Sequence, residues 1–275
     1  MTSTTPVTTG FLTVPDGRLY YEVRGSGPLL ALVGAPMDSG PFVPAAELLA
    51  SDYTVLTPDP RGHGKSTLND PNQDSTPELR ADDLARLITD LDAGPAIVIG
   101  SSGGAITGLA LALHHPEVVS TLIAHEPPLR ELLDDRDALR AEAEDIIDTY
   151  SSVDAEAGVR KFFAMTGLAM PEPVMQQMFA NPRNPEAVAS EAFFYKHEFR
   201  GTAGWEPDLD GLRATPTRVI IGIGDTSTDK FCDRTSRKLA AALGIEPELF
   251  PGGHGGFVED PEAFVKRVRE VLRDN

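Results

Sequence analysis

Short apolar runs alternate with amphipathic helical patterns along most of the chain. Residues 29–33, 96–99 and 119–124 are apolar runs of strand length. Between these runs, apolar residues recur every three or four positions, as in segments 77–91 and 105–113, which is the spacing of one helix face. This alternation is typical of strands and helices that build a parallel sheet. The sequence therefore predicts an α/β fold with a mostly parallel central sheet flanked by helices.

Turn and cap signals mark both ends of this pattern. Near the start, Pro15-Asp16-Gly17 separates two short strand patterns, which predicts a hairpin. Thr76, followed by proline, is typical of the first turn of a helix. Toward the end, strand patterns at 217–221 and 246–250 precede a closing helix with Asp260 as its N-cap.

Helical patterns alone fill the segment from about residue 129 to residue 205. An insertion between two sheet strands suits a lid over a site at the carboxyl ends of those strands. We therefore expect a core of residues 1–128 and 206–275 and a helical lid of residues 129–205. Most apolar side chains of the lid should pack between its helices. The candidates for lining a substrate pocket are Phe162, Phe163, Met165, Met170, Met175, Met178, Phe179, Phe193, Phe194 and Tyr195.

Composition narrows the functional classes. The 275 residues carry a net charge of −18, which repels phosphate backbones and argues against nucleic acid as a partner. No apolar run could span a bilayer and the polar start lacks a signal-peptide pattern, so we expect a cytoplasmic protein with no membrane partner. The single cysteine, Cys232, excludes a disulfide within the chain and a cysteine-based metal cage, and we expect an inert thiol on a helix. The sequence is compatible with a homodimer.

The segment Gly100-Ser101-Ser102-Gly103-Gly104 follows a predicted strand and precedes a predicted helix. This is the setting of the G-x-S-x-G nucleophile elbow, a turn so tight that the positions two before and two after the serine must be small. Around Ser102 these positions are glycines, whereas Ile99 stands two residues before Ser101 and would clash. Ser102 is therefore the candidate nucleophile. The backbone N–H of Gly103, at the helix start, is a candidate oxyanion donor.

A nucleophilic serine needs a histidine as general base and an acid that orients the histidine. Among the six histidines, His254 lies in the glycine-rich loop 251–256, and flanking glycines let such a loop bring the imidazole to another loop. Asp225 follows the strand pattern at 217–221 and completes the chain order Ser, Asp, His of one large class of serine hydrolases. Glu126 also follows a strand and is a second candidate acid. Spacing and order favour Asp225.

Further segments resemble the α/β-hydrolase superfamily, and the resemblance covers essentially the whole chain. Residues 216–225 resemble its acid strand, and residues 250–264 resemble its histidine loop and closing helix. Residues 59–66 resemble its D-x-R-G-x-G-x-S loop. The resemblance implies that His63, within that last loop, is structural and that the helical insert is the cap domain.

The oxyanion hole implied by this resemblance consists of backbone N–H groups. The family usually carries His-Gly before the first donor, whereas the stretch here is Val33-Gly34-Ala35-Pro36. Ala35 can donate, but Pro36 has no N–H. The implied hole is therefore Ala35 and Gly103, with Val33 in place of the usual histidine.

The resemblance and the candidate residues together predict a serine hydrolase with Ser102, Asp225 and His254 as catalytic residues. We expect it to cleave an ester, thioester or lactone bond of a small hydrophobic substrate through an acyl-enzyme, with no metal or cofactor. The serine argues against relatives that open epoxides or remove halides with an aspartate. Carbon–carbon bond hydrolysis, perhydrolysis, amide cleavage and a non-catalytic ligand-binding homologue stay as alternatives, because fold does not fix function.

Overall fold

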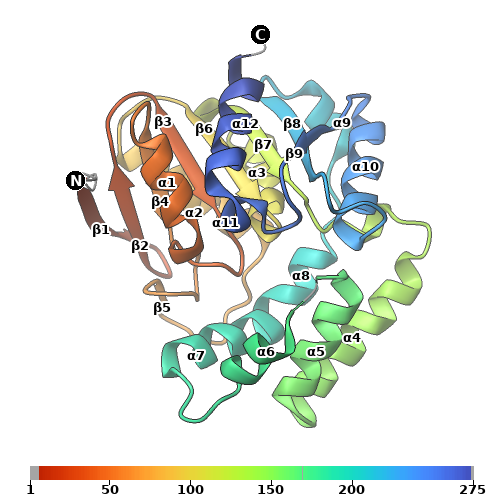
Figure 1. The fold of residues 1–275 in the computed structure, drawn as a ribbon. Helices are drawn as coiled ribbons and strands as arrows, with labels where there is room; N and C mark the ends of the chain where they lie inside the picture. Colours follow the sequence, from red (N-terminus) through yellow and green to blue (C-terminus); the bar gives the residue numbers. More distant parts are fainter. Residues whose placement is uncertain (1–5, 169, 274–275) are drawn as a thin grey trace.

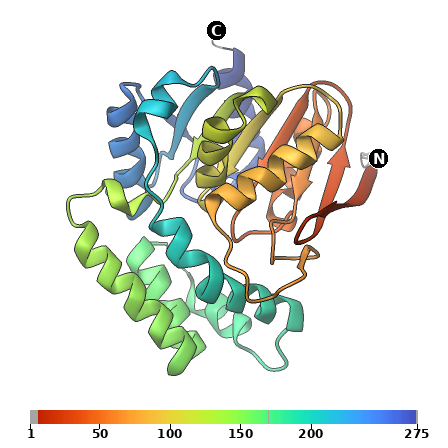
Figure 2. The ribbon, with the colours of Figure 1, turned by 180° about the vertical axis from the view of Figure 1, so that it is seen from behind.

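The computed structural model describes residues 6–168 and 170–273, and one sheet forms its centre (Figures 1 and 2). Within these residues the strand order is β1-β2-β4-β3-β6-β7-β8-β9, with β5 paired to β2. Pairs that involve β2 are antiparallel, and all the others are parallel. The mostly parallel sheet predicted from the sequence is therefore confirmed. The strands are β1 (Val7–Val14), β2 (Gly17–Arg24), β3 (Leu29–Val33), β4 (Thr54–Pro58), β5 (Thr67–Leu68), β6 (Ala96–Ser101), β7 (Val119–His125), β8 (Arg218–Gly224) and β9 (Glu248–Phe250).

Helices cover both faces of the sheet. One face packs against α2, α3 and α10, and the other packs against α1 and α12. Because both faces are covered, the central strand β3 is apolar and buried along its whole length. The helices of this core are α1 (Val43–Leu49), α2 (Pro77–Asp90), α3 (Gly103–His114), α9 (Leu209–Ala214), α10 (Phe231–Leu243), α11 (Gly256–Glu259) and α12 (Pro261–Arg273).

The local signals at the element ends act as the sequence predicts. β1 and β2 form the hairpin, with Val14 opposite Gly17. Thr76 caps α2, because its side chain accepts a hydrogen bond from the Leu79 N–H. At the other end of the chain, Asp260 Oδ1 accepts from the Ala263 N–H at 2.9 Å and starts α12.

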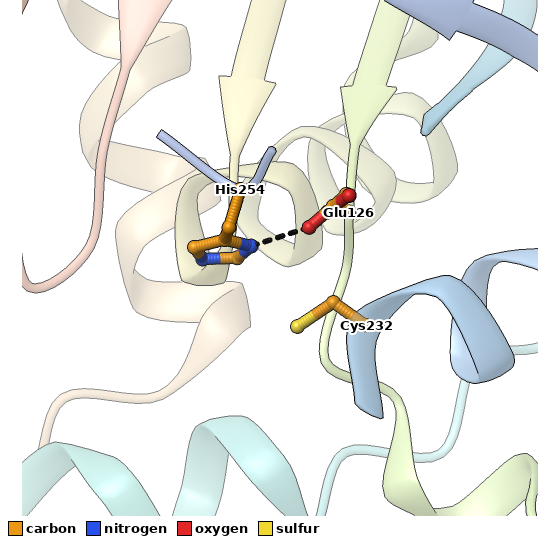
Figure 3. A group of neighbouring side chains, drawn as sticks. All are labelled: Glu126, Cys232 and His254. Atoms are coloured by element: carbon orange, nitrogen blue, oxygen red, sulfur yellow. Dashed lines mark hydrogen bonds and ion pairs between the residues drawn. The ribbon is translucent and has the colours of Figure 1, made fainter. Parts of the chain in front are cut away.

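The described residues between β7 and β8 form helices and no strand. We call residues 129–205 the helical insert. Its helices pack around an apolar core of their own, and they lie together at the end of the sheet toward which β6 and β7 point (Figures 1 and 3). They are α4 (Arg136–Ser152), α5 (Ala155–Thr166), α6 (Glu172–Met178), α7 (Pro185–Phe193), a π-helical turn (Phe194–Glu198) and α8 (Phe199–Ala203).

A buried polar network ties the insert to the sheet domain. Glu198, at the end of the π-helical turn, bonds through Oε2 to His63 Nε2 at 2.9 Å, and Arg80 lies 3.8 Å from the same oxygen. The other ring nitrogen of His63 bonds to Ser190 Oγ at 2.6 Å, and Arg80 donates to Thr202 Oγ1 at 2.9 Å. His63 is thus bonded to the insert on both sides, in line with the structural role expected for it. The network holds the insert in place over the strand ends.

Candidate active site

Ser102 stands on a strained turn between β6 and α3. Its backbone has φ 57° and ψ −125°, a combination that an L-residue adopts only when its surroundings impose it. A Cβ on Gly100 would lie 2.3 Å from the Gly104 carbonyl oxygen, and one on Gly104 would lie 2.1 Å from that of Val33. Both positions therefore require glycine, as the elbow motif predicts. Ser101 is 2% exposed and its Oγ has no hydrogen-bond partner within the described residues, so of the two serines only Ser102 lines the cavity.

His254, which is partly exposed, and Glu126, which is buried, form a hydrogen-bonded pair. His254 Nδ1 lies 2.7 Å from Glu126 Oε2 (Figure 3). The second oxygen of Glu126 accepts from the Gly224 N–H at 2.9 Å, so the carboxylate is held from two sides. Glu126 is fully buried, directly after β7. Within the described residues no hydrogen bond joins Ser102 Oγ to His254, although both line one cavity.

The expectation that Asp225 orients the histidine is wrong. Asp225 is exposed, and its Oδ1 accepts from the Gly252 N–H at 3.0 Å. Its own N–H donates to the Phe250 carbonyl. The short Asp225 side chain thus caps the start of the histidine loop, while the longer Glu126 side chain reaches the imidazole from the neighbouring strand β7. The structure therefore brings Ser102, His254 and Glu126 to one site, and leaves Asp225 outside it.

The electrostatics of this pair favour a carboxylate beside a protonated imidazole. Burial by itself would raise the pKa of Glu126, but the hydrogen bond from His254 and the nearby imidazoles lower it to about 2. Glu126 is therefore a carboxylate at neutral pH. Burial opposes charge on His254, yet the neighbouring Cys232 sulfur and the Glu126 carboxylate raise the pKa of His254 above its usual value. The raised pKa favours the protonated ring, so His254 can accept a proton from Ser102 only in its neutral form.

His125, the last residue of β7, is a second buried imidazole near the site. Its ring packs edge-on against Phe250 and Phe264, with centroids 5.7 and 5.5 Å away. Neither ring nitrogen has a hydrogen-bond partner among the described residues. Burial lowers the pKa of His125 to about 4. His125 is therefore neutral at physiological pH and behaves as a core residue.

The two residues with candidate oxyanion N–H groups border the same cavity as Ser102. Ala35 follows β3 and Gly103 is the first residue of α3, and both line the cavity. Within the described part of the chain, neither N–H donates a hydrogen bond. The loop of Ala35 is braced by Asp59, whose Oδ1 accepts from the Ser39 N–H at 2.8 Å. This brace supports the loop although Val33 replaces the usual histidine.

The cavity at Ser102 is small, with a volume of about 50 Å³, which is below the usual range of small-molecule sites. Of the candidate pocket residues in the insert, Phe162, Met165 and Phe194 line it, while others, such as Met175, are buried between helices. No Asp, Glu, Lys or Arg lines it among the residues described. Its remaining walls come from Pro36, Pro128, Thr166, Leu168, Phe199, Thr202, Ala203, Phe231 and Cys232.

A larger and more polar recess adjoins this cavity. Pro36, Phe162 and Phe194 line both spaces, so these three side chains form the partition between them. The recess also contacts charged residues of the insert, including Arg183 and Glu191. The partition therefore separates an apolar inner space from a polar outer one.

Cys232, expected to be an inert thiol, lies at the site. It is the second residue of α10 and 4% exposed, and it lines the cavity with His254. Its sulfur, an imidazole nitrogen of His254 and a carboxylate oxygen of Glu126 lie within 4.8 Å of one another (Figure 3). Sequence spacing carried no signal for this neighbourhood, because the three residues come from distant parts of the chain.

The sheet, the strained serine turn after β6 and the adjacent histidine–carboxylate pair define an enzyme of the α/β-hydrolase class. The chain belongs to the alpha/beta hydrolase family, whose model matches residues 29–267. No helix in the described ranges is both long and apolar enough to cross a membrane.

Relatives match the chain over nearly its whole length. An uncharacterized hydrolase of Bacillus subtilis, YraK, is 32% identical over 97% of this chain and 96% of its own. The zearalenone hydrolase of Bionectria ochroleuca is 27% identical over 95% of this chain and 97% of its own. Among solved structures, a thermophilic esterase from Thermogutta terrifontis is similar with a TM-score of 0.73 and 24% identity, covering 97% of this chain and 98% of that one. The two sequence relatives named here, both hydrolases, thus align with nearly the whole of this chain.

Proposed function

We propose that this protein is a serine hydrolase that cleaves an ester or lactone bond of an uncharged, apolar substrate through an acyl-enzyme. The observation that carries the proposal is the hydrogen bond of 2.7 Å that Glu126 makes with His254, which lines the same cavity as Ser102. Ser102 is the nucleophile, His254 the general base and Glu126 the orienting acid. No step requires a metal or a cofactor.

The chemistry follows from this arrangement. His254 Nε2 takes the proton of Ser102 Oγ as the oxygen attacks the substrate carbonyl, and Glu126 stabilises the imidazolium through Nδ1–H. The alcohol leaves with the proton from Nε2, and the acyl group stays on Ser102. A water molecule, deprotonated by the same nitrogen, then releases the acid.

The negative oxygen of the tetrahedral intermediate would be bound by the N–H groups of Ala35 and Gly103. Neither group has another partner within the described residues, and Gly103 adds the dipole of α3. Such a donor is worth on the order of 3 kcal/mol of transition-state stabilisation.

The lining of the cavity supports an uncharged substrate. A substrate amine or carboxylate would lose its hydration there without a charged partner, at a cost of several kcal/mol. This disfavours aminopeptidase activity among the amide-cleaving alternatives. The helical insert supplies most of the apolar walls, so we propose that residues 129–205 act as a cap over the site.

The test is covalent labelling combined with turnover of short p-nitrophenyl esters. Ser102→Ala should lose labelling by a fluorophosphonate probe and reduce turnover to background. Ser101→Ala is the matched control, because the Ser101 Oγ is buried and Ser101 does not line the cavity, and this variant should keep both labelling and turnover. Uncharged acyl chains should be hydrolysed better than amino- or carboxyl-bearing chains of equal length. Labelling that survives in Ser102→Ala would exclude this nucleophile.

A further inference from the structure

Glu126, Cys232 and His254 bring three kinds of metal ligand together at one point. Their donor atoms, one oxygen, one sulfur and one nitrogen, lie within 4.8 Å of one another (Figure 3). Around a tetrahedral zinc ion such donors stand about 3.3–3.6 Å apart. Side-chain movements of about an ångström would therefore complete three corners of a tetrahedron.

The charge of the cluster also suits a cation. The only ion pair of Glu126 within the described residues is with His254, so its buried carboxylate has no Lys or Arg partner there. When a metal binds, the thiol gives up its proton to solvent, and thiolate and carboxylate together balance a divalent charge. Cys232 and His254 both line the cavity, so an ion that enters from solvent can reach them.

We propose that Glu126, Cys232 and His254 form an inhibitory site for a thiophilic divalent cation such as Zn²⁺. The ion is not part of the hydrolytic reaction. If it binds Nδ1, the remaining ring proton must lie on Nε2; if it binds Nε2, the basic lone pair is occupied. In both cases His254 can no longer accept the proton of Ser102. The inhibition rests on the proposed function, whereas the binding of the ion does not.

Binding is tested with Co²⁺, a coloured substitute for Zn²⁺, on protein freed of metal with EDTA and then dialysed. The wild type should show the near-ultraviolet thiolate-to-cobalt absorption, and Zn²⁺ should abolish it by displacement. Ser102→Ala should show the same absorption, because the ligand set is intact. Cys232→Ser and Cys232→Ala should lack it.

Inhibition is tested by titrating ester turnover with Zn²⁺, each variant being normalised to its own activity without metal. Loss of an outer-shell partner of a metal site can weaken binding about a hundredfold, so loss of the Cys232 ligand should raise the half-inhibiting Zn²⁺ concentration by more than that. His115→Ala is the control for binding of Zn²⁺ at the surface, because His115 pairs with a partly exposed Asp82. Zn²⁺ should inhibit this variant at the same concentration as the wild type.

Three results would overturn the proposal: a wild type that binds no Co²⁺, a Co²⁺ complex without thiolate absorption, or equal Zn²⁺ inhibition of Cys232→Ala and wild type. An inactive wild type that still binds Co²⁺ through its thiolate would instead contradict the proposed hydrolase function alone.

Discussion

Replacement of Glu126 by glutamine keeps the size of the side chain and changes one oxygen into an NH₂ group. In the structure, Oε1 accepts from the Gly224 N–H at 2.9 Å and Oε2 faces His254 Nδ1 at 2.7 Å. The glutamine oxygen must stay toward Gly224, because only an acceptor satisfies that N–H. The NH₂ group then faces Nδ1, which must accept, and the ring proton moves to Nε2. This tautomer cannot take the proton of Ser102.

We expect Glu126→Gln to lower kcat by about 10⁴, the cost of the wrong tautomer in other serine triads, which corresponds to about 5.5 kcal/mol. Asp225→Asn is the matched control. Its side-chain oxygen can still accept from the Gly252 N–H, and the residue is exposed, so kcat should change by no more than about twofold.

The assay is kcat for a short p-nitrophenyl ester in the presence of a chelator, together with the thermal midpoint of each variant. Similar midpoints would show that the activity change does not come from unfolding. If Asp225→Asn loses more activity than Glu126→Gln, or if Glu126→Gln stays within about tenfold of the wild type, the assignment of the acid is refuted.

Four further predictions concern pH, stability and specificity. Because His254 must be neutral to act and its pKa is raised, kcat/KM should rise with pH along a limb whose midpoint lies above 6.5; a midpoint below 6.5 would contradict this. The pKa of His125 is lowered from 6.5 to about 4. Below pH 6.5 this imidazole is therefore protonated in the unfolded chain but stays neutral in the folded protein, and the stability of the fold decreases. We would measure the free energy of unfolding of wild type and of His125→Leu at about pH 7.5 and about pH 5. On going to the lower pH, the wild type should lose about 2 kcal/mol relative to the variant. Glu198→Ala leaves the buried Arg80 guanidinium without its carboxylate and should cost about 3–5 kcal/mol in urea unfolding, whereas Glu144→Ala, which removes an exposed pair, should cost no more than about 1 kcal/mol. Phe162→Ala should open the partition between the two cavities and shift relative kcat/KM toward longer acyl chains by about 1–3 kcal/mol; equal scaling of all chain lengths would refute the partition.

Features that depend on a few neighbouring residues could be predicted from the sequence. The serine turn is one of them in part, because Gly100 is required by its contact with Gly104 within the same strand–turn–helix unit, whereas Gly104 is required by its contact with Val33 at the end of β3. The N-caps at Thr76 and Asp260 are others. Each of these signals consists of one backbone conformation and the residue types that tolerate it.

Features that depend on packing between distant segments could not be predicted in the same way. The pattern from 185 to 199 indicates one continuous helix, yet the structure contains a π-helical turn at Phe194–Glu198. That turn places Phe194 against the cavity and Glu198 against His63. π-helical turns frequently occur at functional sites. The role of this one becomes clear only from the contacts between the insert and the core.

The choice between the two acids shows the same limit at the centre of the site. β7 lies beside β6, whereas β8 is one strand further from Ser102, and each strand adds about 4.8 Å. An acid after β7 is therefore nearer the serine, and glutamate has the additional methylene needed to reach the imidazole. Asp225, after β8, instead holds the backbone of the loop that carries His254 through Gly252. Both carboxylates thus serve the same histidine, one by contact and one through its loop, and the linear order of the residues does not distinguish these roles. Their distinction depends on which loop the histidine turns toward, and that direction exists only once β7, β8 and β9 are assembled side by side.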